Sequence, residues 1–332
     1  MTIVNAAGAA SDSNGDSTTS ISSSAAQLPS TTVTLVDAAL EVLLEADPFE
    51  KARIGEEVAS RWLNGDISVA YRNRSTIANT CDHPLPPDRP ARSDNIDLVP
   101  SNLMHKLGKG GSIHSRQSMV HSLVHIESWV VDLSWDIIVR FGRTESMPNE
   151  FFTDFVRVAQ DEGRHFTLLA TRLRELGSFY GAFPAHDGLW DSAMDTSNSL
   201  LARLAIEHCV HEARGLDVLP TTISRFRSGG DEETANLLEK VIYPEEITHC
   251  AAGVKWFSYL CNRQRQAEIG EPPIDSSSSS STLLDAAAGT IQTFHSTVRE
   301  HFRGLLKPPF NKQARDVAGF HPDWYEPLAI KH

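Results

Sequence analysis

Long apolar runs, paired cysteines and early basic residues are all missing from this sequence of 332 residues. No apolar run approaches the roughly 20 residues that a membrane-spanning helix needs, so we expect no membrane segment. The cysteines form no Cys-x-x-Cys pair, and we expect buried, reduced side chains in place of disulfides. They are Cys81, Cys209, Cys250 and Cys261.

The first lysine or arginine is Lys51, and residues 1–32 are mostly Ser, Ala, Thr, Gly and Asn. A secretory signal needs a basic start followed by an apolar stretch, and a transit peptide needs arginines. We therefore expect a disordered tail and a cytoplasmic protein, with a nuclear location also open.

The charge balance is acidic, with a formal net charge of −13 and a pI of about 5.5. A net charge of this sign disfavours nucleic acid and anionic membranes as partners. Apolar residues make up 40 % of the chain, which is enough for a sizeable core. The sequence shows no Ser-His-Asp set, phosphate loop or zinc-finger spacing.

Apolar periodicity predicts an all-α fold. A helix over 33–46 precedes a second helix over 48–63, which Asp47-Pro48 opens with a cap and a first-turn proline. Glycines mark the turns between four longer helices, and one more helix follows a serine tract. We expect these five near 115–142, 148–177, 194–227, 231–263 and 283–305.

These elements divide the chain into five parts. The first two are a disordered tail (1–32) and N-terminal helices with a Pro-rich segment that wraps over the surface (33–114). The third is a two-metal four-helix bundle (115–263). The last two are a Ser-rich linker (264–282) and a C-terminal helix with an aromatic tail (283–332), which we expect to pack onto the domain.

Each of the four central helices has an inward apolar stripe that an acidic residue interrupts near its middle. A carboxylate buried alone costs several kcal/mol unless it is paired or bound to a metal. Positions i and i+3 share a helix face, so both residues of a Glu-x-x-His motif can reach one ion. Two such motifs, each preceded by an inward glutamate 34 or 35 residues earlier, predict a two-metal carboxylate site. Its expected ligands are Glu127, Glu162, His165, Glu212, Glu246 and His249.

Three residues are catalytic candidates. Glu162 and Glu246 can each bridge two ions, and His208 lies one turn before Glu212 on the same face. His208 could be an extra ligand, a hydrogen-bonding neighbour of a ligand, a proton shuttle or a core histidine. Glu245 is the alternative ligand if the helical phase is off by one residue.

The pattern predicts the roles of the other polar groups and glycines near the stripe less specifically. His125 and His211 fall off the stripe and are expected at the surface or behind the ligands. Asp161 could orient a ligand histidine, although we favour a solvated acid. Glycines inside the helices, Gly215 and Gly253 among them, either leave room for O₂ or substrate or allow close helix packing.

Several stretches carry a family resemblance, among them HIESWVVDLSWD, FVRVAQDEGRHFTLLATRLRELG, LLARLAIEHCVHEARGLDVLP and EEITHCAAGVKWFSYLC. Here the sequence resembles the ferritin-like superfamily, and more closely an uncharacterised bacterial and fungal family with a ferritin-like domain of unknown function. The resemblance covers most of residues 33–332. It implies a ferritin-like four-helix bundle with additional N- and C-terminal helices, and the same six ligands. The chain is more distantly similar to di-iron tRNA hydroxylases, whose tRNA partner suits this acidic sequence poorly.

The expected function is that of an O₂-dependent, monooxygenase-like oxidoreductase. Carboxylate-rich ligation suits two iron ions, with manganese possible. The expected partners are a small organic substrate, O₂ and an electron-donating reductase, since no flavin or iron–sulfur motif is visible. Iron oxidation and storage, or a non-catalytic helical module stapled by metal, are the alternatives. An apolar pocket that reaches the metals favours an oxygenase, whereas a flat, self-complementary outer face favours a ferritin cage.

Overall fold

The structure is a computed structural model that describes residues 33–72, 85–104, 106–269 and 280–329. The expected tail, most of the serine tract and Cys81 lie outside these residues. The described residues are helical and contain no strand, only isolated bridges from Leu98 to Ala185 and from Leu306 to Ala329. The predicted all-α class is therefore confirmed.

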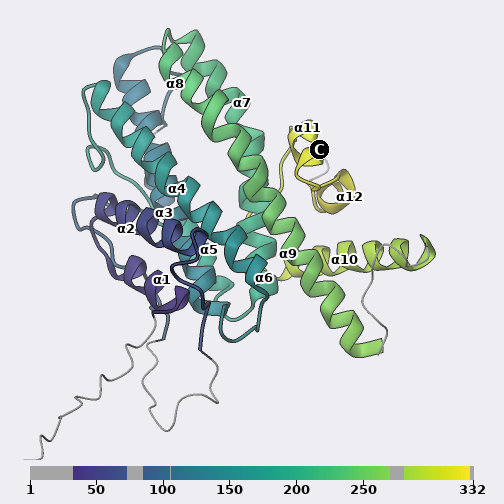
Figure 1. Ribbon diagram of the computed structural model, residues 1–332. Coiled ribbons are helices and arrows are strands. Elements are labelled where there is room, and N and C mark those ends of the chain that lie inside the picture. Colours follow the sequence, from purple (N-terminus) through teal and green to yellow (C-terminus); the bar gives the residue numbers. More distant parts are fainter. Residues whose placement is uncertain (1–32, 73–84, 105, 270–279, 330–332) are drawn as a thin grey trace, which may run out of the picture. The chain divides into compact units, whose positions relative to one another are not determined.

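Twelve α-helices are found in the described part of the chain (Figure 1). The first six are α1 (Leu35–Leu44), α2 (Pro48–Leu63), α3 (Ile113–Phe141), α4 (Asn149–Glu175), α5 (Gly188–Asp195) and α6 (Leu200–Ala205). The others are α7 (Glu212–Ser228), α8 (Glu232–Leu237), α9 (Tyr243–Ile269), α10 (Ser280–His301), α11 (Lys312–Val317) and α12 (Pro322–Tyr325). Two π-helical segments, η3 (Ile206–His211) and η4 (Leu238–Ile242), and two 3₁₀ turns, η2 (Ser101–Leu103) and η5 (Glu326–Leu328), complete the list.

Local sequence explains where the helices begin. The Asp47 carboxylate accepts hydrogen bonds from the backbone N–H groups of Phe49 and Glu50, both at 2.9 Å, and Pro48 occupies the first turn. Ser112 caps α3 in the same way, through the N–H of Ser115. These caps satisfy backbone donors that the helix itself leaves unpaired.

The long helices pack side by side. α3 lies along α4, and α7 lies along α9, while α4 and α6 both contact α9 (Figure 1). α1 packs on α3, and α2 packs on α4. Fully buried aromatic rings fill the spaces between them, including Trp135, Phe151, Phe155 and Phe257. This arrangement holds the middles of α3, α4, α7 and α9 at fixed positions.

The third and fourth central segments differ from the regular helices that periodicity predicts. The helix expected from residue 194 begins at Leu200, where the Ser199 hydroxyl accepts the N–H of Ala202. The π-helical segment η3 then leads directly into α7, and η4 leads into α9. A π turn inserts an extra residue into the helix and rotates the side chains that follow onto another face.

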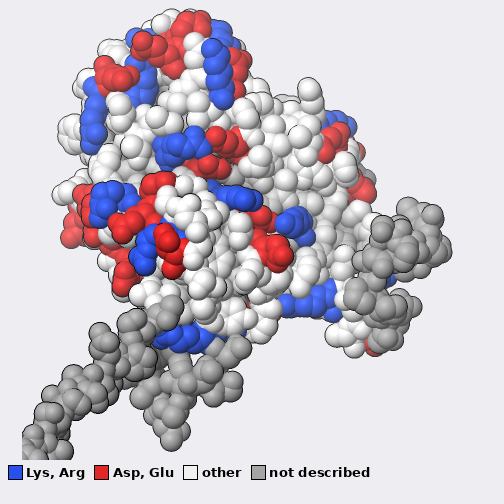
Figure 2. Space-filling model, viewed as in Figure 1, with Lys and Arg blue, Asp and Glu red and all other residues white. Residues whose placement is uncertain are grey.

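The C-terminal tail packs onto the helices, as expected. Trp324 and Tyr325 are buried, and the Trp324 ring lies 6.0 Å from that of Phe257 on α9. None of the described helices is both long and apolar enough to span a membrane. On the face shown in Figure 2, acidic and basic side chains are interspersed.

Candidate metal centre

The six residues predicted as metal ligands come together between α3, α4, α7 and α9. They form two overlapping groups, and within each group one candidate ligand atom per residue lies within 4.8 Å of the others. Glu162 and Glu246 belong to both groups, which is the position that bridging carboxylates would take. All six side chains are buried. The groups are Glu127, Glu162, His165 and Glu246, and Glu162, Glu212, Glu246 and His249.

Several polar atoms at the centre of this cluster lack a hydrogen-bond partner among the described residues. They include both carboxylate oxygens of Glu162 and the Nδ1 atoms of His165 and His249. The atoms are nevertheless close, because His249 Nδ1 lies 2.9 Å and His165 Nδ1 lies 3.3 Å from an oxygen of Glu162. Buried polar atoms are normally hydrogen-bonded, so converging unpaired donor atoms fit a site for cations. Oxygen-rich ligation with two imidazoles suits iron or manganese.

The outer nitrogens of both histidines are held by acids in a crossed pattern. His165 Nε2 lies 2.6 Å from Glu245 Oε2, and His249 Nε2 lies 3.3 Å from Asp161 Oδ2. Each of these acids immediately precedes the ligand glutamate of the other motif. Arg164 donates to both acids, at 2.6 Å to Asp161 and 2.8 Å to Glu245. A proton fixed on each Nε2 leaves Nδ1 free to face the cluster.

The close packing of acids and imidazoles changes their pKa values. Burial, followed by repulsion from Glu162 and Glu246, raises the pKa of both Glu127 and Glu212 well above the ordinary value.

Burial alone would raise the pKa of Glu162, but the imidazoles of His249 and His165 hold it well below its usual range. Burial would lower the pKa of His165, yet the carboxylates of Glu162 and Glu246 raise it to about 12. Burial would also lower the pKa of His249, yet Glu162 and Asp161 raise it well above its ordinary value, so without metal both histidines hold protons that a metal would displace.

A cavity of about 910 Å³ lies against the cluster, between α3, residues 183–189, η3 and α7. Its wall is mostly apolar and includes Glu127, Glu212 and Glu246. Gly215 also lines it, and a Cβ there would lie 3.8 Å from Glu246 Oε2, so the glycine keeps this approach open. Gly253 plays the other expected role: a Cβ there would lie 1.9 Å from the carbonyl oxygen of His208, so close helix packing requires glycine.

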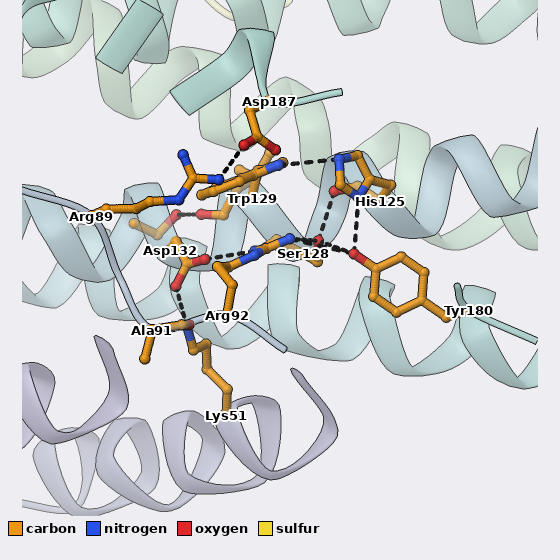
Figure 3. Close-up of polar contacts among 12 residues, drawn as sticks. Lys51, Arg89, Ala91, Arg92, His125, Ser128, Trp129, Asp132, Tyr180 and Asp187 are labelled. Carbon is orange, nitrogen blue, oxygen red and sulfur yellow. Dashed lines mark hydrogen bonds and ion pairs between the residues drawn. The ribbon is translucent and has the colours of Figure 1, made fainter. Parts of the chain in front are cut away.

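A second buried polar group, the Asp132 cluster, fastens residues 85–100 to α3 (Figure 3). It consists of Lys51, Arg92, Ser128, Asp132 and Tyr180. The Asp132 carboxylate accepts from Lys51 at 2.6 Å and from Arg92 at 2.7 Å. Arg92 also donates to the hydroxyl of Ser128 at 2.8 Å, and that hydroxyl lies 2.8 Å from the Tyr180 oxygen. Each charged group in this cluster therefore contacts a group of opposite charge.

The Asp132 cluster also supports the cavity wall. The Tyr180 hydroxyl lies 2.9 Å from Nδ1 of His125 (Figure 3). The Nε2 of that ring lies 3.1 Å from the carbonyl oxygen of His186. Burial, aided by Arg92, lowers the pKa of His125 to about 4, so the ring is neutral. The guanidinium of Arg92 stacks 3.8 Å from the Trp129 ring, and Trp129 and His125 both line the cavity.

The remaining predicted residues lie near the cluster, outside both ligand groups. His208 is buried against Phe155, and its Nε2 has no hydrogen-bond partner among the described residues. Burial lowers the pKa of His208 to about 3, so it is a neutral neighbour of the cluster. Glu245 and Asp161 hold the histidines, so Asp161 is not the freely solvated acid that we favoured. His125 is buried, and His211 is half-buried with its Nε2 3.2 Å from the Ser192 hydroxyl.

Two residues were missed by the sequence reasoning. Arg164 joins the two outer acids, and Glu207 is a buried acid in the cavity wall. Glu207 directly precedes His208 and lies four residues before His211, which was the available signal. Glu207 lies beside the predicted inward stripe of His208 and Glu212, and the cavity wall includes all three residues.

The same region carries the similarity to known proteins. A family model described as "Protein of unknown function (DUF455)" matches residues 44–326, which include all six candidate ligands. An uncharacterized protein of Haemophilus influenzae is 36 % identical over 205 residues, which span 60 % of this chain and 63 % of that protein. No solved structure matches the chain. Because the family model covers most of the sequence, the chain belongs to the family of proteins of unknown function DUF455.

Proposed function

We propose that this protein is a di-iron carboxylate oxidoreductase of the ferritin-like type, which uses O₂ to hydroxylate or oxidise an organic substrate. The observation that carries the proposal is the mostly apolar cavity whose wall includes Glu127, Glu212 and Glu246. A site that only stores iron or staples helices needs no such space beside its carboxylates. The packing of α3, α4, α7 and α9 around the cluster supports a ferritin-like four-helix bundle.

The residues of the site would have three roles: ligation, orientation of the ligands and binding of the substrate. Glu162 and Glu246 would bridge two ions, Glu127 and His165 would complete one site, and Glu212 and His249 the other. Asp161 and Glu245 would keep the imidazoles oriented. The cavity would hold an organic substrate against the exposed side of the cluster and keep bulk water away.

The metal pair would supply the redox chemistry. When bound, two ferrous ions would reduce O₂, so that one oxygen atom enters a substrate C–H bond and the other leaves as water after uptake of two protons and two electrons. Those electrons must come from an external donor, since the sequence has no recognisable flavin or iron–sulfur motif. Manganese would fit the same ligands.

Iron binding and O₂ consumption test the proposal. The protein would be reconstituted anaerobically with Fe(II), its metal counted by elemental analysis, and its absorbance and O₂ uptake followed after exposure to O₂. We expect about two irons per chain and an absorbance change on exposure to O₂. Glu162→Ala should lose both, whereas Glu57→Ala, which removes an exposed acid on α2, should keep both.

Two other outcomes would decide against the proposal. No retained iron or manganese after reconstitution would leave a helical protein whose buried glutamates need another explanation. Iron that accumulates far beyond two ions per chain while O₂ is consumed would favour iron oxidation and storage.

A further inference from the structure

Glu207 is a buried acid in the cavity wall, and no described residue balances its charge at close range. Its side chain is fully buried, and neither carboxylate oxygen accepts a hydrogen bond from the described residues. The nearest group that can carry positive charge is His211, whose Nε2 lies 3.9 Å away. That nitrogen already lies 3.2 Å from the hydroxyl of Ser192. A carboxylate taken out of water in this way needs a counter-charge or a proton.

The metal centre does not provide that counter-charge. Two divalent ions would balance the four glutamates of the two ligand groups, and Glu207 belongs to neither group. The buried arginine nearest in sequence, Arg203, is already paired with Asp136 and donates to the carbonyl of Ala193. Glu207 therefore remains unbalanced even in a fully loaded site.

The surroundings of Glu207 favour an organic ligand over a free ion. The cavity it lines is mostly apolar, with Leu133, Val130 and the Trp129 ring in the same wall. Its volume of about 910 Å³ is that of a site for a small organic molecule. Glu207 is carried by the π-helical segment η3, and such turns are frequent at functional sites.

From these observations we infer that the cavity takes a mainly apolar molecule carrying a protonated primary amine, with Glu207 as the counter-ion of the amine. The inference rests on the proposed function in one respect: the cavity that adjoins the metal ligands is the substrate site. The ammonium would pair with Glu207, and the apolar part would lie along the wall toward Glu127 and Glu212.

An anionic ligand is the competing possibility, because two basic residues also line the cavity. Lys106 and Arg214 are exposed to solvent. Water can solvate both cations, so neither requires a ligand for its charge, whereas the covered carboxylate of Glu207 does. The buried acid therefore outweighs the exposed bases in selecting the ligand.

Binding of three probes of equal chain length tests the inference. Octylamine, octanol and octanoate would be titrated into the full chain loaded with Mn(II) under anaerobic conditions, with calorimetric detection. We expect octylamine to bind about tenfold or more tightly than octanol, and octanoate to bind most weakly. Glu207→Gln should remove the advantage of the amine over the alcohol.

Matched variants separate this effect from general attraction to an acidic protein. Glu57→Gln removes an equal charge from an exposed position and should leave the preference for the amine intact. Glu207→Asp keeps the charge, so it should keep a preference for the amine. If Glu207→Gln fails to fold, the order of the three probes on the unsubstituted protein still tests the inference.

The outcomes are distinct from those for the proposed function, because neither iron nor O₂ takes part. Equal binding of amine and alcohol, or a preference that survives Glu207→Gln, would overturn the inference and leave Glu207 as a wall residue without a ligand. Tightest binding of octanoate would overturn it in favour of the exposed bases. A preference for the amine in a protein that fails to react with O₂ would retain the ligand class and reject the oxidase.

Discussion

Two buried polar clusters include residues of α3, and they differ in how their charges are matched. In the Asp132 cluster one carboxylate contacts two cations, Lys51 and Arg92, and its polar atoms have partners (Figure 3). In the metal centre four glutamates share two histidines, whose Nδ1 atoms lie 2.9 and 3.3 Å from the carboxylate of Glu162. A cluster that contains its own counter-charges stabilises the fold, whereas a cluster with surplus carboxylates requires a cation from outside.

The largest expected effect comes from a substitution in the Asp132 cluster. Asp132→Ala would leave the buried ammonium of Lys51 without its carboxylate, and we expect it to destabilise the protein by about 3–5 kcal/mol. Glu212→Gln in the metal-free protein should change stability by no more than about 1 kcal/mol, because it relieves repulsion from Glu246 and Glu162. Urea denaturation in the presence of a chelator measures both. Equal losses would show that the acids of the metal centre are also structural.

Metal binding should make the metal centre stabilise the folded protein. Mn(II) at about 100 times its dissociation constant should raise the free energy of unfolding by about 2.7 kcal/mol, because it binds the folded state alone. Thermal unfolding with Mn(II) and with chelator gives the difference. Glu246→Gln should abolish most of it, since Glu246 belongs to both ligand groups. A stabilisation that survives this variant would place the bound metal elsewhere.

A smaller effect is expected one layer outside the ligands. Arg164→Gln removes the donor shared by Asp161 and Glu245, and we expect metal affinity to fall about 10- to 100-fold. The metal-free protein should keep its stability, because Arg164 is 41 % exposed. Competition with a chelator measures the affinity, and Arg157→Gln on the exposed side of the same helix is the control. A matching loss of metal-free stability would mean that Arg164 acts through the fold.

The ligands and helices could be predicted from sequence because both depend on local periodicity. Glu127, Glu162 and Glu246 interrupt apolar stripes that the 3.6-residue period identifies directly. Spacing of 34 to 35 residues then places the interruptions at one depth. The structure brings all six predicted residues together, and Asp47-Pro48 begins α2 as expected.

The surroundings of the ligands depend on contacts between distant segments, which no local pattern encodes. Asp161 reads as a surface acid, yet it meets His249 from a helix that lies 88 residues further along the chain. Glu207 lies beside the predicted inward stripe, and it becomes part of a cavity wall only where residues 183–189 and α3 face η3. The cavity itself forms because residues 183–189 lie against α3, and the periodicity of a sequence does not predict where a loop lies in the fold.

The last and smallest difference between the clusters should lie in their response to pH. In the metal-free protein the pKa values of Glu127 and Glu212 are raised above 4.5, and that of His165 is raised from 6.5 to about 12. The folded state then keeps protons that the unfolded chain has released, so these groups stabilise at low pH and lose that effect as pH rises. Glu162 shifts in the opposite direction, and its contribution is lost only at acid pH.

We therefore expect the stability of the metal-free protein to decline between pH 5 and 8, and Glu212→Gln to reduce that decline. Metal binding displaces the same protons, so in Mn(II) stability should instead rise over this range as the affinity increases. Urea denaturation at three pH values, with chelator and with Mn(II), measures both slopes. Asp132 is paired with cations in either condition, so Asp132→Asn should lower both curves without changing the difference between them. Parallel curves in the unsubstituted protein would contradict the view that the surplus carboxylates and protonated histidines await a cation.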